Sequence, residues 1–175
     1  MIVHKKTLLS LVGLCFIAVV SVFAVQGKWR AATEKELAAL LPARAPVEKE
    51  QIETEMRTAS GFTDGKGKFF AAVVIITAGY AAEGKYSHFL TTQVPVKIGA
   101  MTLQPGEYVF GQKRVDANTI EVKFHEAASG KLLGSVNAQR GQAKGAIRSI
   151  TIAPPKGNTG TIYLGRFAFQ YTVSE

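Results

Sequence analysis

The chain has 175 residues, of which 47% are hydrophobic, and it carries a formal net charge of +8. This length suits one domain with its own core, and the hydrophobic content excludes a chain that is disordered throughout. The single cysteine, Cys15, excludes an internal disulfide and a metal site built from several thiolates.

The first 24 residues have the three parts of a secretory signal peptide. A basic stretch ending in Lys6 precedes residues 7–24, which carry no charge, and residues 22–24 offer modest side chains where signal peptidase reads them. The apolar run also reaches the lower length limit of a membrane-spanning helix, so an uncleaved N-terminal membrane anchor is the alternative. Both arrangements export the rest of the chain. We therefore expect a periplasmic or extracellular protein that meets a membrane only through residues 7–24, if these are not cleaved.

Residues 25–60 are predicted to form a short helical extension. Thr33 and Glu36 stand at capping-box spacing, and leucines follow at helical spacing until a proline, which predicts a helix over 33–41. Residues 47–59 fit a helix and a strand almost equally, because their apolar side chains recur both at four-residue spacing and at every second position. Helix propensity favours a helix there.

Residues 61–175 have the pattern of a β domain. The uncharged run 69–78 is rich in β-branched side chains and predicts a strand that is buried on both faces. Further strand-like runs, most of them separated by turn residues, follow at 86–94, 96–103, 107–113, 118–125, 131–139, 146–153 and 161–173. This spacing predicts a mainly β fold, an antiparallel β-sandwich of immunoglobulin-like type with about seven or eight strands. A small closed β-barrel is the alternative.

One hairpin can be predicted in register. If Gly130 takes a left-handed conformation in a bulged turn, Val122 lies opposite Val136 and Phe124 lies opposite Gly134. This register pairs apolar with apolar side chains, whereas a tighter loop would not.

The positive charge is concentrated in the β domain. Residues 25–60 are neutral, and residues 61–175 carry thirteen basic and seven acidic side chains. A basic exported domain suits an anionic envelope component, such as lipid headgroups or acidic glycans, or another envelope protein as its partner. Nucleic acid is not expected, because export and the lack of aromatic residues among the charges argue against it.

One cluster of these charges forms a candidate anion-binding edge. Arg140, Lys144 and Arg148 bring three positive charges without an acid, on a segment that also contains two glycines. Lys156 and Arg166 could extend this edge. A solvated loop is the alternative interpretation.

A second candidate site is the connection that follows the most apolar strand. Tyr80, Lys85, Tyr86 and His88 bring polar groups to one end of the fold, and binding residues occur more often on loops than on strands. We therefore treat these four residues as a candidate ligand loop.

The sequence offers little support for catalysis or for a cofactor. Ser87 precedes His88, but adjacent side chains on a strand point to opposite faces, so we expect no hydrogen-bonded pair there. The only other histidine after residue 24 is His125, and both histidines are expected at the surface. Two distant histidines without a cysteine predict no metal site, and no cofactor is expected.

The segments "VPVKIGAMTLQPGEYVFG" and "EVKFHEAASGKLLGSV" resemble small exported bacterial β-proteins of unknown function that share a P-V-x-I-G…L-x-P-G-x-Y segment. The resemblance covers residues 94–138 and implies an envelope protein with a sandwich-like fold, without implying catalytic residues.

These observations together predict a non-enzymatic binding or scaffolding module of the bacterial envelope. One alternative is a small β-barrel that carries an apolar ligand in a cavity lined by residues 69–78 and 161–173. The other is a hydrolytic enzyme that uses His88 or His125.

Overall fold

The computed structural model describes residues 28–77, 79–141 and 146–174. The predicted signal peptide or anchor lies outside these described residues. Within them, no helix has both the length and the hydropathy that crossing a bilayer requires.

The fold is mainly β, as predicted, with two short helices. The strands of the described residues are β1 (Arg30–Ala31), β2 (Arg44–Val47), β3 (Glu50–Thr63), β4 (Phe69–Ile75), β5 (His88–Thr92), β6 (Val96–Ile98), β7 (Met101–Leu103), β8 (Gly106–Arg114), β9 (Thr119–Glu126), β10 (Leu132–Arg140), β11 (Thr151–Lys156), β12 (Thr159–Leu164) and β13 (Phe167–Val173). The helices are α1 (Glu34–Leu40) and α2 (Gly79–Ala82).

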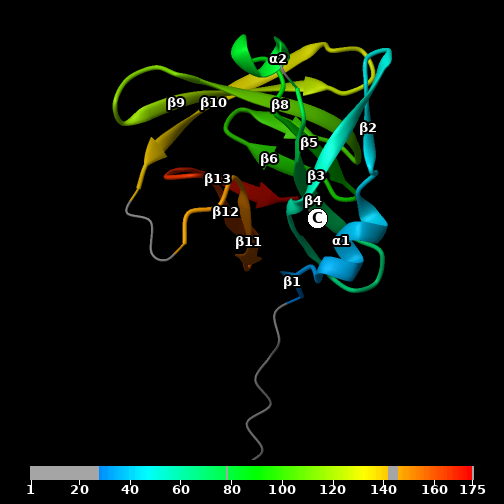
Figure 1. Cartoon of the computed structure of the whole chain (residues 1–175). Coiled ribbons are helices and arrows are strands. Elements are labelled where there is room, and N and C mark those ends of the chain that lie inside the picture. The colour runs from blue at the N-terminus through cyan, green and yellow to red at the C-terminus, as the bar shows by residue number, and fades with distance from the viewer. Residues whose placement is uncertain (1–27, 78, 142–145, 175) are drawn as a thin grey trace, which may run out of the picture.

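The strands form an antiparallel sheet that curls until it is nearly closed. Its order is β1-β3-β4-β5-β8-β9-β10-β13-β12-β11, and β6 and β7 attach beside β13. The two ends of this order come together, because the Ile152 amide on β11 donates to the Ser60 hydroxyl on β3 at 2.8 Å. In Figure 1 the turn between β8 and β9 and the end of β10 lie on the left, and α1 and β2 lie on the right.

Most of the segment favoured as a helix at 47–59 belongs to strand β3, so the preference for a helix is wrong. Pairing decides between the two patterns, because β3 is hydrogen-bonded to β2 on one side and to β4 on the other. The bulge between Glu55 and Ser60 lets the long strand bend. Gly61 permits the close approach to β4, since a Cβ there would lie 2.6 Å from the Phe70 carbonyl oxygen. Within residues 28–60, therefore, α1 is the only helix that the structure shows.

Two runs that were predicted as single strands are hairpins. Residues 96–103 turn back at Gly99, and residues 161–173 turn back at Gly165, each glycine having a φ of +58°. Left-handed φ values of this kind favour glycine. With β1, β2 and β3 added, the described strands exceed the seven or eight that we predicted.

Local signals predicted two features well. Helix α1 begins at a capping box in which Thr33 accepts from the Glu36 amide and the Glu36 carboxylate accepts from the Thr33 amide. The β9–β10 hairpin has the predicted register, with Val122 opposite Val136, Phe124 opposite Gly134, and Gly130 left-handed.

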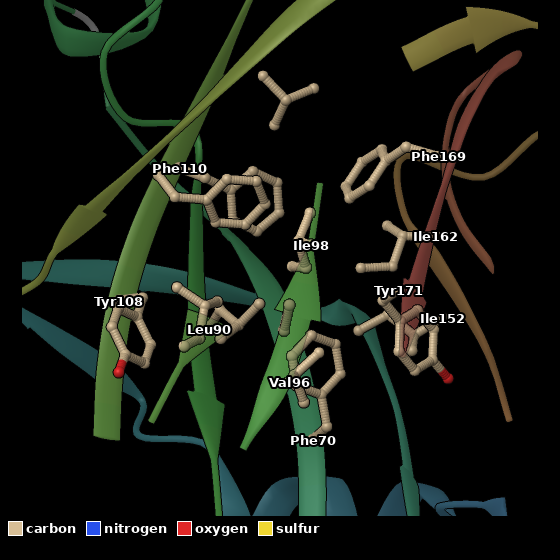
Figure 2. Packing of buried hydrophobic residues seen from close by; sticks show 14 of the residues in the cluster. Phe70, Leu90, Val96, Ile98, Tyr108, Phe110, Ile152, Ile162, Phe169 and Tyr171 are labelled. Carbon is tan, nitrogen blue, oxygen red and sulfur yellow. The ribbon is translucent and has the colours of Figure 1, made fainter. Parts of the chain in front are cut away.

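The inside of the curved sheet is filled by apolar side chains. Phe62, Phe70 and Tyr171 stack with ring centroids 5.5 to 5.6 Å apart. Figure 2 shows Tyr108, Phe110 and Leu90 pointing inward from one side and Phe169 and Ile162 from the other. This core occupies the middle of the sheet.

A second apolar cluster lies on the outer face of β4, β5 and β8. It contains Ala71, Val73 and Ile75 of β4, and α1 and β2 cover it with Leu37 and Val47, among others. Strand β4 is therefore buried on both faces, as its uncharged sequence predicts.

Candidate functional site

On several strands, the side chains that face inward change from apolar to polar towards one end of the sheet. On β8, Tyr108 and Phe110 face the core, and the same alternation continues to Gln112 and Arg114. On β10, Ala138 faces the core and Arg140 follows it by two residues. Residues from these strand ends line an open pocket of about 680 Å³, which we call the cationic pocket.

Three arginines line the cationic pocket: Arg114, Arg140 and Arg166. The guanidinium groups of Arg114 and Arg140 both donate to the Ala117 carbonyl oxygen at 3.5 Å, so they are close neighbours. Arg114 also lies over the Phe167 ring, 5.2 Å from its centroid. None of the three forms an ion pair with a carboxylate of the described residues.

The rest of the pocket wall is largely apolar. It includes Val74, Ile75 and Ile76 at the end of β4 and Leu164 and Phe167 around the β12–β13 turn. These are the two segments that the carrier hypothesis predicted as the walls of a cavity. The pocket opens to solvent at the end of the sheet, whereas the middle of the sheet is filled.

Ser87 and His88 also line the cationic pocket, and their side chains are hydrogen-bonded. The Ser87 Oγ lies 2.8 Å from the His88 Nδ1. Our prediction that this pair does not form is wrong, because β5 begins at His88 and Ser87 lies in the preceding loop, where strand alternation does not apply. His88 is also only 4% exposed, so the prediction of a surface histidine is wrong as well.

The environment of His88 makes it a weak base. Its ring is stacked on Phe110 with centroids 4.6 Å apart, and burial lowers its pKa to about 4. Its Nε2 atom has no hydrogen-bond partner among the described residues. If Nδ1–H donates to Ser87 and the Ser87 hydroxyl donates to the Phe110 carbonyl oxygen at 3.4 Å, both donors are paired. Ser87 then keeps its proton, which suits binding better than nucleophilic attack.

The predicted anion-binding edge is divided in the structure. Arg140 and Arg166 lie in the cationic pocket, but Arg148 lines a different groove, of about 840 Å³, between α1, β3 and β11. Lys156 is the last residue of β11 and lines neither of these two pockets. Lys144 lies outside the described residues. A single edge of Arg140, Lys144 and Arg148 is therefore not what the described part of the chain presents.

The predicted ligand loop is also divided. Tyr80, Lys85 and Tyr86 come together, with the Lys85 Nζ 4.8 Å from the Tyr86 ring centroid and 5.6 Å from that of Tyr80. Tyr86 and Lys85 both donate to the Glu48 carboxylate, at 2.6 and 3.4 Å. His88 does not belong to this group, because it faces the cationic pocket.

The contact between Tyr86 and Glu48 anchors the loop to the β2–β3 hairpin. Burial raises the pKa of the Tyr86 phenol, and the hydrogen bond from Tyr86 is the main cause that lowers the pKa of Glu48. Gly130 leaves room for this pair, since a Cβ there would lie 2.7 Å from the Tyr86 hydroxyl. We interpret this group as a structural anchor.

We expect Glu48→Ala to destabilise the protein by about 2 kcal/mol, because it leaves the buried Tyr86 hydroxyl without an acceptor. Glu50→Ala is the matched control, because among the described residues the Glu50 carboxylate accepts only from Tyr80, which is not buried. Urea unfolding measures both. In Glu48→Ala/Tyr86→Phe the unpaired hydroxyl is absent, so we expect part of the lost stability to return. A double variant less stable than Glu48→Ala would contradict the role of this contact as a structural anchor.

His125 is buried too, so the prediction that it lies at the surface is wrong. It packs edge-on against Tyr86 with centroids 5.2 Å apart, and burial is the main cause that lowers its pKa. Among the described residues, no group of three or more potential ligands is arranged to hold a metal ion.

Sequence reasoning missed Arg114 and Gln112, and it dismissed Ser87 as a partner of His88. The signal for Arg114 and Gln112 lies in the inward-facing side chains of β8, which change from aromatic to polar within four residues. No local signal identifies Ser87, because its role depends on where β5 begins.

Comparison with known proteins gives no assignment for this site: no protein-family model, curated protein or solved structure matches the chain.

Proposed function

We propose that this chain is a non-enzymatic binding protein of the bacterial envelope, which holds a small amphipathic anion in the cationic pocket. The observation that carries the proposal is the set of three arginines that line one pocket, none of them paired with a carboxylate of the described residues. Like charges held together are costly unless an anion joins them, and guanidinium groups suit carboxylate and phosphate oxygens.

The pocket wall indicates that the ligand has an apolar part. Side chains of β4 and of the β12–β13 turn lie beside the arginines, so an alkyl or aryl group would leave water as the charged group meets Arg114 and Arg140. The Ser87 hydroxyl adds one neutral hydrogen-bonding group to the same wall.

The nearly closed sheet supports a small barrel over an immunoglobulin-like sandwich. Its ends meet between β3 and β11, and one inner core serves strands from around the whole sheet. In this form of the carrier hypothesis the ligand is bound at the open end and not deep inside, since stacked aromatic rings fill the middle.

Hydrolysis has less support, although Ser87 and His88 are hydrogen-bonded. To act as a general base, His88 would have to become a buried cation against Phe110, and no carboxylate of the described residues orients its free nitrogen. Binding requires no such change of protonation.

The test compares two amphiphiles that share one alkyl chain. We expect octyl phosphate to bind to the full chain and octyl glucoside to bind at least tenfold more weakly, as measured by isothermal titration calorimetry. Arg140→Ala should weaken octyl phosphate about tenfold, and Arg114→Ala/Arg140→Ala about 100-fold, because each arginine supplies a charge-assisted hydrogen bond.

Arg44→Ala is the matched control. It removes the same side chain from an exposed position on β2, outside the cationic pocket, and should leave binding unchanged. Equal affinity for the two amphiphiles, or equal losses in Arg44→Ala and Arg140→Ala, would remove the support for this function.

A further inference from the structure

The margin of the cationic pocket carries exposed apolar side chains. Ile76 is 58% exposed and Ile147 is 50% exposed, and both line the pocket. Val115, which is 60% exposed, directly follows Arg114 in the turn between β8 and β9. We call these three residues the apolar rim.

The apolar rim and the arginines belong to one end of the sheet. Ile76 follows β4 and Ile147 precedes β11, and both line the pocket, while Val115 directly follows the pocket residue Arg114 at the end of β8. Exposing such side chains costs free energy in water, and large ones that gather around a site mark an interaction surface.

We propose that the apolar rim docks the protein on an anionic lipid bilayer. Exposed isoleucine and valine side chains can enter the boundary between headgroups and acyl chains, while adjacent arginines meet the negative headgroups. This inference rests on the proposed function, because the docked bilayer supplies the amphipathic anion to the cationic pocket.

Charge complementarity favours a lipid surface over a protein partner. Arg114, Arg140 and Arg166 surround the opening, and the β8–β9 turn contributes one carboxylate, Asp116, which accepts from the Asn118 amide. The lining of the cationic pocket itself contains three arginines and no carboxylate of the described residues. Each basic residue near an anionic membrane strengthens binding about fivefold.

The test uses a fluorescent probe at the rim, so that it reports on this surface and not on the N-terminal apolar segment. In the full chain with Cys15→Ser, the environment-sensitive dye NBD is attached to Val115→Cys. The control carries the dye at Leu132→Cys, which is 53% exposed at the start of β10 and lies outside the cationic pocket.

We expect vesicles of equal parts phosphatidylglycerol and phosphatidylcholine to shift the Val115 probe to the blue and leave the Leu132 probe unchanged. Pure phosphatidylcholine should give no shift. Ile76→Ser/Ile147→Ser should raise the lipid concentration needed for a half-maximal shift about tenfold, because less apolar surface enters the bilayer. Equal responses at the two probes, or equal responses to the two kinds of vesicle, overturn the proposal.

Octyl phosphate separates this inference from the proposed function. A protein that binds octyl phosphate but whose Val115 probe ignores the anionic vesicles does not dock as proposed, although its pocket functions as a binding site. A protein whose probe responds without any binding of octyl phosphate has a docking surface and lacks the proposed ligand site.

Discussion

Gly111→Ala is expected to destabilise the protein by about 3 kcal/mol, a large loss for a domain of this size. Gly111 lies on β8, where the loop before β5 crosses it. A Cβ on Gly111 would lie 2.4 Å from the Gly84 carbonyl oxygen and 2.5 Å from that of Lys85. Both contacts are to backbone atoms, which cannot rotate away, so the loop would have to move.

The displacement would also reach the cationic pocket. The Ser87 amide donates to the Phe110 carbonyl oxygen at 2.9 Å, one residue from Gly111, and this bond positions Ser87 beside His88. We therefore expect weaker binding of octyl phosphate in Gly111→Ala in addition to the loss of stability.

Gly134→Ala is the matched control for this prediction. It places a methyl group in strand β10, where the nearest atom is the end of the flexible Met101 side chain at 3.2 Å. Alanine also lowers the entropy of the unfolded chain, so we expect a change within about 1 kcal/mol. Urea unfolding followed by the fluorescence of Trp29, the single tryptophan, measures both variants. Similar urea midpoints for Gly111→Ala and Gly134→Ala would contradict this prediction, because they would show that the loop moves at little cost in stability.

The features that the sequence predicted correctly depend on neighbouring residues. The capping box of α1 needs only Thr33 and Glu36, and the β9–β10 register follows from one left-handed glycine and the alternation on either side of it. Interactions between residues that lie close together in the chain decide both, so a single sequence contains the necessary information.

The features that were predicted wrongly from the sequence depend on partners that are distant in the chain. Residues 50–63 form β3 because β2 and β4 supply hydrogen bonds on both sides, and these outweigh a small helix propensity. Closure of the sheet depends on β3 meeting β11, about 90 residues away in the chain. Periodicity alone could not choose between a sandwich and a barrel.

The candidate site shows the same limit. Arg140 was identified from the cluster of basic residues around it in the sequence. Arg114 was missed because it lies on another strand, although both arginines donate to the Ala117 carbonyl oxygen. The hydrogen bond between Ser87 and His88 was missed because the prediction began the strand two residues too early.

The second large expected effect is a dependence of stability on pH that arises from His88. Burial lowers its pKa in the folded state to about 4, whereas an unfolded chain has a histidine pKa near 6.5. The unfolded state therefore binds the proton more readily, and stability falls as the pH falls from about 6.5 towards 4. Between pH 7 and pH 5 this loss amounts to about 2 kcal/mol.

Replacing His88 by phenylalanine should remove this part of the pH dependence. Phenylalanine keeps an aromatic ring against Phe110 and loses only the hydrogen bond to Ser87, whose hydroxyl can still donate to the Phe110 carbonyl oxygen. Urea unfolding at pH 7 and pH 5 gives the comparison, with Ser87→Ala as the control that loses the hydrogen bond but keeps the titrating ring. We expect the original chain and Ser87→Ala to lose stability by similar amounts, and His88→Phe to lose only what His125 contributes, since burial lowers the pKa of that residue as well. An unchanged loss in His88→Phe would place the titrating group elsewhere, and His125→Phe would then be the variant to measure.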